Sequence, residues 1–173
     1  NVLIAFANHE IQEFEEIYFN DELITLDVDG NVTAPAKFVN RAKVIQRLGT
    51  DDQEAVEIEG SETWDADHRA RGIAYLYVAL NYSRDAFANG IPTVTATVKG
   101  KKVEDPRTST TAYSNNSALC LRDFLISSGI AGTDELDDTL FAAAANVCDE
   151  VVAFNSVQEA GDFVTGQLYE IKF

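Results

Sequence analysis

The two histidines are the first places to look for chemistry, because imidazole serves both as a metal ligand and as a general base near neutral pH. His9 follows an apolar run, and His68 closes the segment Trp64-Asp65-Ala66-Asp67-His68. Neither has a second His or a Cys at the short spacing that metal sites use. We therefore expect a turn before the next strand at residues 64–69, with metal ligation by Asp65, Asp67 and His68 as the alternative.

Signatures of nucleophilic or phosphate chemistry are missing from the sequence. It contains no Gly-x-Ser-x-Gly, no Gly-x-x-x-x-Gly-Lys-Ser/Thr and no Gly-x-Gly-x-x-Gly. Carboxylate pairs occur by chance among 29 acidic residues, so no glycosidase dyad stands out. We expect a protein that is not an enzyme and nominate no catalytic, cofactor-binding or metal-binding residue.

The segment Asp27-Val28-Asp29-Gly30-Asn31 resembles the opening of a calcium loop. An EF-hand needs its glycine at the sixth position and a glutamate at the twelfth, whereas here the glycine is fourth and no such glutamate follows. The segment predicts a turn, with calcium binding as the weaker interpretation.

The two cysteines, Cys120 and Cys148, have no Cys-x-x-Cys spacing and no neighbouring histidine, which disfavours zinc. One interpretation is that both are small buried apolar residues. The other is a disulfide or close contact between two packed helices, which would suit an extracellular particle.

The formal charge of −16 limits the partners of this chain. Nucleic acids and anionic lipids attract cationic surfaces, so stable binding to either is not expected. The longest uncharged apolar run, residues 72–82, is far shorter than the about 20 residues that cross a bilayer. We expect no membrane segment.

Alternating residues predict antiparallel strands in the first half of the chain. Residues 13–26 predict a hairpin that turns at Asn20-Asp21-Glu22, and residues 41–48 predict a strand that ends at Gly49. Residues 50–60 predict a polar, acidic loop with little burial. Residues 73–82 are apolar on both sides of the strand, which predicts a central strand with both faces covered.

Strict alternation continues at residues 93–98, with threonines outward and valines and alanine inward. We expect Gly100-Lys101-Lys102 to turn the chain, and the Thr/Ser-rich residues 108–114 to form an ordered loop or irregular strand.

Helical spacing predicts two short helices after residue 115. The first starts at Asn116 or Ser117 as N-cap and ends at Gly129; the second starts at Thr133. The first helix should share an apolar face made of Ala118, Leu121, Phe124 and Leu125. The second should have a buried stripe made of Leu136, Leu140, Ala143 and Val147. A last strand or hairpin is expected to end near residue 173.

Together these patterns predict an α+β fold: mainly an antiparallel sheet or partial barrel, with two short packed helices toward the C-terminal third. The expected division is a β-rich segment at 1–110 and a helical pair with a terminal strand or hairpin at 111–173. Both ends have strand patterns without caps, so we expect a piece of a longer protein.

Two stretches resemble the tail-tip proteins of siphophages and prophages of the lambda J type. One runs from Ile91-Pro92 through Lys99-Gly100-Lys101 to Asp105-Pro106-Arg107. The other is Ser114-Asn115-Asn116-Ser117-Ala118-Leu119-Cys120-Leu121-Arg122-Asp123-Phe124-Leu125, with Val147-Cys148-Asp149-Glu150 after it. The resemblance covers residues 65–150. Ser117 stands where the family often has Pro, and residues 151–173 do not match.

The resemblance implies a structural component of the baseplate hub at the distal end of the tail tube, in the virion. It implies contacts with other tail-tip and tail-tube proteins and a homotrimer in the full-length protein. An acidic channel wall would also let DNA slide without sticking. Two other functions stay open: a carbohydrate- or receptor-binding β module that uses Trp64, Tyr113 and Tyr169, and a cell-wall hydrolase domain.

Overall fold

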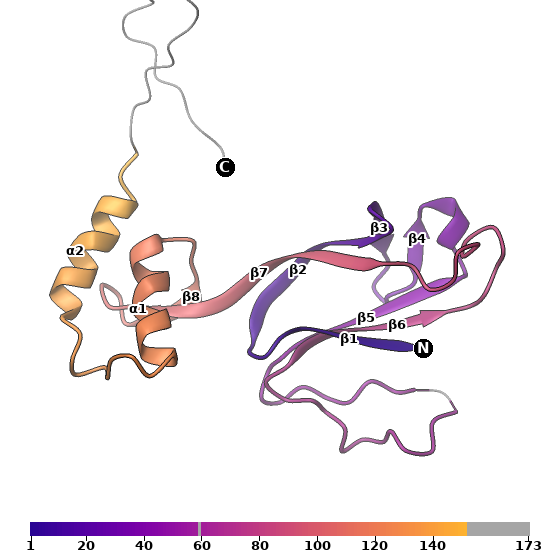
Figure 1. Cartoon of the computed structure of the whole chain (residues 1–173), viewed down its shortest axis with the longest axis horizontal. Coiled ribbons are helices and arrows are strands. Elements are labelled where there is room, and N and C mark those ends of the chain that lie inside the picture. The colour runs from indigo at the N-terminus through magenta and orange to yellow at the C-terminus, as the bar shows by residue number, and fades with distance from the viewer. Residues whose placement is uncertain (59, 152–173) are drawn as a thin grey trace, which may run out of the picture. The chain divides into compact units, whose positions relative to one another are not determined.

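The computed structural model describes residues 1–58 and 60–151, which fall into two compact units (Figure 1). The sheet unit comprises Asn1–Glu104 and Thr111–Ser114. The helical unit comprises Asp105–Thr110 and Asn115–Phe173, described as far as residue 151. The α+β class is confirmed. The chain passes between the units more than once, because the turn that joins the last two strands clusters with the helices and residues 111–114 cluster with the sheet unit.

A three-stranded antiparallel sheet has the order β1-β6-β5. Its strands are β1 (Val2–Ala7), β6 (Ala74–Leu80) and β5 (Ala42–Leu48). The predicted central strand is confirmed, since β6 lies between the other two.

A five-stranded sheet has the order β4-β3-β2-β7-β8. Its strands are β4 (Val32–Ala34), β3 (Glu22–Leu26), β2 (Ile11–Phe19), β7 (Val94–Asp105) and β8 (Thr110–Tyr113), and a short 3-10 helix, η1 (Ala36–Phe38), follows β4. The predicted hairpin is confirmed: Phe19 pairs with Glu22 across Asn20 and Asp21. Both turn residues have positive φ, 49° and 65°, as a two-residue type I′ turn requires.

The expected turn at Gly100-Lys101-Lys102 is wrong, because β7 continues through it to Asp105. Pairing with β2 overrides the local signal: Lys101 pairs with Ile11 and Lys99 with Glu13. The Lys99 ammonium also contacts the carboxylates of Glu13 and Glu15. Cross-strand pairing and ion pairs therefore hold the strand extended where glycine alone would favour a turn.

A bulge in β2 keeps its apolar residues on one face. The register shifts between Phe14 and Glu16, so Phe14 and Ile17 both point into the core although they are three positions apart. The opposite residues on β7, Val98 and Ala96, alternate regularly. Val98 is nevertheless 37% exposed, so its predicted inward position is only partly confirmed.

The main core lies among residues of both sheets. Leu76 and Val78 of β6 join Ile11, Ile17 and Ile24 of the larger sheet in one buried cluster. Aromatic rings extend this cluster: Phe19 meets Phe38 edge-on at 5.4 Å, and Phe38 stacks on Phe87 at 5.7 Å between ring centroids. The loop that carries Phe87 is thereby anchored to the core.

The other face of β6 is covered by the loop after β5. Tyr75 and Tyr77 pack there with Val56, which is 1% exposed. The buried Gln53 side chain accepts from the Gly49 amide and donates to Ala70 O, so it joins the loop's two ends. The predicted cover on both faces of the strand is confirmed. The small burial expected for residues 50–60 fails at Gln53 and Val56, while the other described residues of that range are exposed or half-buried.

The predicted turn at 27–31 is confirmed. Asp27 Oδ1 accepts hydrogen bonds from the amides of Asp29 and Asn31, so this carboxylate oxygen stabilises the turn itself. Gly30 has φ 82°, and a Cβ there would lie 2.3 Å from Val44 O. Only glycine fits, because the turn presses against β5 at this point.

Two antiparallel helices, α1 (Ser117–Ser127) and α2 (Asp138–Cys148), form the helical unit. Asn116 is the α1 N-cap, as predicted, and Gly129 follows the helix with φ 67°. The second helix starts later than expected, because Asp137 and not Thr133 is its N-cap. No helix in residues 1–58 and 60–151 is long and apolar enough to cross a membrane. The predicted terminal strand lies outside the described residues.

Candidate interaction surfaces

A cluster of polar side chains, here called the polar clamp, joins the turn after β7 to both helices. It consists of Asp105, Arg107, Asn116, Asn146 and Asp149. Two nitrogens of the Arg107 guanidinium donate hydrogen bonds to the Asp105 carboxylate: Nε to Oδ1 at 2.9 Å and Nη2 to Oδ2 at 2.8 Å. Its third nitrogen, Nη1, donates to Asn146 Oδ1 at 3.0 Å and to Asp149 Oδ2 at 2.7 Å. One arginine thus ties the turn to the end of α2.

Asn116 contributes the other half of the polar clamp. Its Oδ1 accepts from the amides of Ala118 and Leu119, which caps α1. Its Nδ2 donates to Asp149 Oδ1 at 2.8 Å and to Ala145 O at 2.9 Å. The side chain is buried, so the cap and the bond to Ala145 O form away from water, whereas the bond to Asp149 is only partly buried.

Charge pairing sets the protonation states in the polar clamp. The bonds from Arg107 lower the pKa of the Asp105 and Asp149 carboxyls, and Asn116 lowers that of Asp149 further. The two carboxylates raise the pKa of Arg107 in turn. These groups stay charged at neutral pH and bond to one another, which favours a structural role over proton transfer.

A second arginine, Arg122, forms an ion pair between the two helices at the other end of the pair. Arg122 on α1 is buried, and its Nε donates to Asp138 Oδ1 at 2.7 Å. The buried apolar residues of the described helical unit are only Ala118, Leu119 and Ala145. With so little apolar burial, the polar contacts carry much of the helix pairing. Sequence patterns missed Arg122 and Asn146, although Arg122 four positions after Ala118 shares its helix face.

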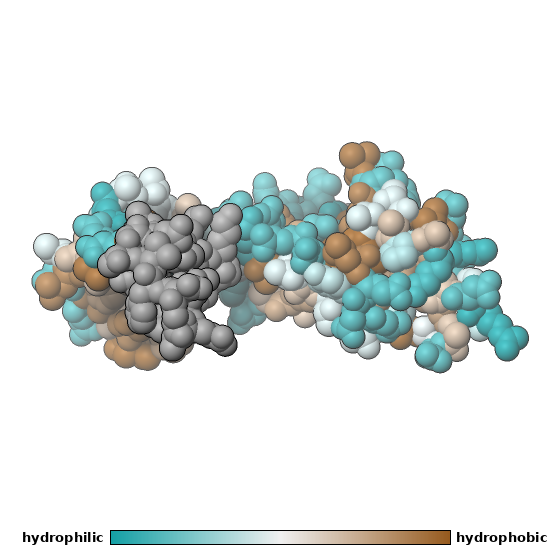
Figure 2. Space-filling model, turned by 90° about the horizontal axis from the view of Figure 1, so that it is seen from above, coloured by the Kyte–Doolittle hydropathy of each residue, from teal (hydrophilic) through white to brown (hydrophobic). Residues whose placement is uncertain are grey.

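The burial predicted for the second helix's stripe is wrong, because Leu140, Ala143 and Val147 are exposed; on the first helix's predicted face Ala118 is buried, but the larger side chains are not. Leu121 and Phe124 on α1 are 52% and 56% exposed, and Leu140 and Val147 on α2 are 67% and 65% exposed. These four residues are here called the apolar hairpin face. The helices pack through small residues and the Arg122 ion pair instead. Figure 2 shows hydrophobic side chains at the surface of the helical unit, at the left of the view.

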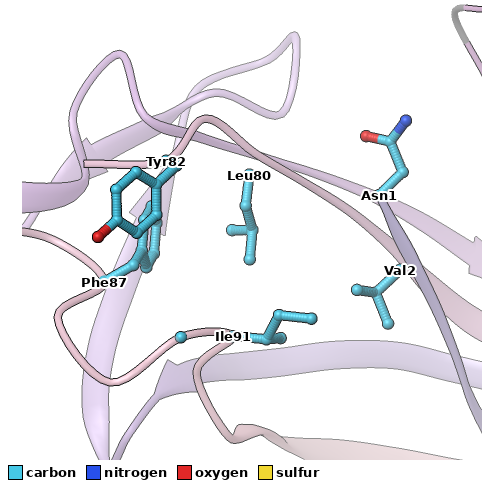
Figure 3. A pocket seen from close by; sticks show the side chains of 7 residues that line it. Asn1, Val2, Leu80, Tyr82, Phe87 and Ile91 are labelled. Carbon is cyan, nitrogen blue, oxygen red and sulfur yellow. The ribbon is translucent and has the colours of Figure 1, made fainter. Parts of the chain in front are cut away.

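An apolar pocket of about 210 Å³ lies in the sheet unit, at the end of β1 and β6. Figure 3 shows Val2, Leu80 and Ile91 directed toward a shared hollow, with Tyr82 and Phe87 along one side. Tyr82 and Ile91 are largely exposed. The volume suits one aromatic or aliphatic group, and the apolar walls suit binding rather than catalysis.

The predicted turn at 64–69 is confirmed. Asp65 Oδ1 accepts from the Asp67 amide at 2.9 Å and lies 2.8 Å from His68 Nδ1. Both contacts lower the pKa of Asp65, the hydrogen bond from the Asp67 amide more than the contact with His68. The His68 ring also stacks on Trp64. Across the described ranges, no group of three or more His, Cys, Asp or Glu side chains could hold a metal ion.

Both cysteines, Cys120 and Cys148, are exposed. The interpretation that they are buried apolar residues is therefore wrong, and they are not joined by a disulfide in this structure.

The aromatic residues considered for a shallow sugar site have different environments. Trp64 is half-buried, stacks on His68 and donates from Nε1 to Val56 O. Tyr113 lies on β8 and is 39% exposed. Tyr169 lies outside the described residues.

Comparison with known proteins adds no relative. No family model matches the chain, and no curated protein and no solved structure matches it.

Proposed function

We propose that this chain is a structural component of a phage or prophage tail tip, a segment of the baseplate hub in the virion. In this role it is not an enzyme, needs no cofactor, and assembles with neighbouring tail-tip and tail-tube proteins. The full-length protein would form a homotrimer, in which this segment helps to build the distal end of the tube.

The observation that carries the proposal is the composition of the polar clamp. Asp105 and Arg107 come from the first stretch that resembles the tail-tip family, and Asn116 and Asp149 come from the second. Residues as far as 42 positions apart in sequence, Arg107 and Asp149, therefore meet in one hydrogen-bonded cluster. The resemblance rests on residues that shape the helical unit, as a scaffold protein would require, and the acidic charge of −16 suits a wall along which DNA slides.

Immunogold electron microscopy of particles from the source strain tests this function. Antibodies raised against the whole chain should label one end of each tail, and mass spectrometry of purified tails should recover a longer polypeptide containing this sequence. Labelling of the capsid, or purified tails without the sequence, would rule the proposal out. Unlabelled particles that nevertheless contain the sequence would place the segment inside the tube wall.

A further inference from the structure

The apolar hairpin face is the feature of the surface that the fold itself does not explain. Leu121 and Phe124 are three positions apart on α1, and Leu140 and Val147 are seven apart on α2, so each pair follows a helical stripe. All four are more than half exposed. An apolar stripe in an otherwise acidic helix pair is typical of a contact surface.

Helical geometry puts the two stripes on one side of the pair. The contact side is marked by Arg122 on α1 and Ala145 on α2, both buried. At about 100° per residue, viewed from each N-terminus, Leu121 and Phe124 lie about 100° and 160° counter-clockwise from Arg122. Leu140 and Val147 lie about 140° and 160° counter-clockwise from Ala145.

The helices run antiparallel, because the α1 N-cap contacts the last turn of α2 and Arg122 contacts the first turn of α2. The same rotational sense on antiparallel helices points to the same side. All four residues therefore lie to the same side of the helix contact. Leu121 and Leu140 point most directly to that side, and Phe124 and Val147 point mainly outward, away from the opposite helix.

Charge selects the occupant of this face. The described helical unit carries eight carboxylates and two arginines, a formal charge of −6. Both arginines are already ion-paired, Arg107 with Asp105 and Asp149 and Arg122 with Asp138. A second copy would bring the same negative charge. Residues 152–173 of this chain, with three carboxylates and one lysine, also carry the wrong sign.

We propose that the apolar hairpin face binds an amphipathic helix of another protein, whose apolar stripe is flanked by Lys and Arg. Such a helix would complete a three-helix arrangement, packing on Leu121 and Leu140 between the outer residues Phe124 and Val147, while its cations meet the carboxylates at the two ends of α2. Each helix here has 11 residues, about 16 Å, so a partner helix of three to four turns matches its length. The binding surface is independent of the tail-tip function.

Fluorescence anisotropy with two synthetic 18-residue helices tests the proposal on the full chain. Both peptides carry the same leucine stripe, flanked by lysines in one and by glutamates in the other. The lysine peptide should bind at least tenfold more tightly. The double variant Leu121→Ser/Leu140→Ser should weaken that binding at least tenfold, whereas Leu23→Ser/Val28→Ser, which changes exposed apolar residues of the sheet unit, should leave it within twofold.

Circular dichroism should show unchanged helix content in both double variants, because the substituted side chains are exposed. Three results of the binding assay would overturn the proposal: no binding of the lysine peptide, equal binding of both peptides, or binding that the double variant of the helices leaves unchanged. Light scattering tests the other possible occupant, a second copy of this chain. A concentration-dependent dimer that Leu121→Ser/Leu140→Ser abolishes would assign the face to that copy and overturn the proposal. None of these results depends on where the protein lies in a virion.

Discussion

Removal of the Asn116 side chain should largely unfold the helical unit while leaving the sheet unit folded. Asn116→Ala deletes the α1 cap, worth about 1 kcal/mol. It also deletes a buried bond to Ala145 O and a partly buried bond to Asp149, each worth about 1 kcal/mol. The expected loss is about 3 kcal/mol. A unit with 43 described residues has a total stability of only about 2–6 kcal/mol, at about 0.05–0.15 kcal/mol per residue.

Two spectroscopic probes separate the units in a urea titration. Both described α-helices belong to the helical unit, so ellipticity at 222 nm follows that unit. The single tryptophan, Trp64, reports on the sheet unit. In Asn116→Ala the 222 nm transition should move to lower urea or be lost, and the fluorescence transition should stay in place.

Two further variants isolate the cause. Asn115→Ala changes the exposed neighbour and should alter neither transition. Asn116→Asp keeps an acceptor for the cap but removes both donated bonds and places a carboxylate beside Asp149. It should therefore be destabilised at pH 7 and partly recover as the pH falls toward 5, because like charge raises the pKa of the new carboxyl. A loss below about 0.5 kcal/mol in Asn116→Ala, or an equal shift of both transitions, would refute this account of the polar clamp.

Three other outcomes follow from the same structure. The carboxyls of the polar clamp have lowered pKa values, so the stability that they contribute is complete above the unfolded pKa of about 4 and is lost at lower pH. The urea concentration at the midpoint of the 222 nm transition should therefore be lower at pH 3 than at pH 6. A midpoint that does not change with pH would contradict the assignment. Gly30→Ala should cost more than about 2 kcal/mol by tryptophan fluorescence, since a Cβ there meets Val44 O at a positive φ, and a smaller cost would mean that this turn is free to shift. Asp21→Gly should stabilise the sheet unit by about 0.5 kcal/mol, because type I′ turns favour Asn-Gly. Asn20→Gly should not stabilise it, because this variant loses the hydrogen bond that the Thr93 amide donates to Asn20. Equal effects of the two variants on stability would argue against that hydrogen bond.

Local sequence patterns predicted the parts of this protein that depend on neighbouring residues. The type I′ turn at Asn20-Asp21, the central strand β6 and the Asn116 cap all follow from backbone preferences and alternation within a few positions. The α+β class follows from the same signals, because strands and helices differ in their apolar period.

Tertiary structure decided which apolar residues are covered. Pairing with β2 carries β7 through Gly100, where the local signal predicts a turn. The buried Gln53 and Val56 lie in a segment with no apolar period, because their burial depends on the sheet beneath them.

The helix pair is the clearest case of this division. An apolar period shows that Leu121, Phe124, Leu140 and Val147 share helix faces, but it does not identify the surface that meets those faces. The described helices pack through Leu119, two alanines and an arginine–carboxylate pair, and the polar clamp joins them to the turn after β7. The sequence therefore determined that these stripes exist, and only the tertiary structure decided that they point outward.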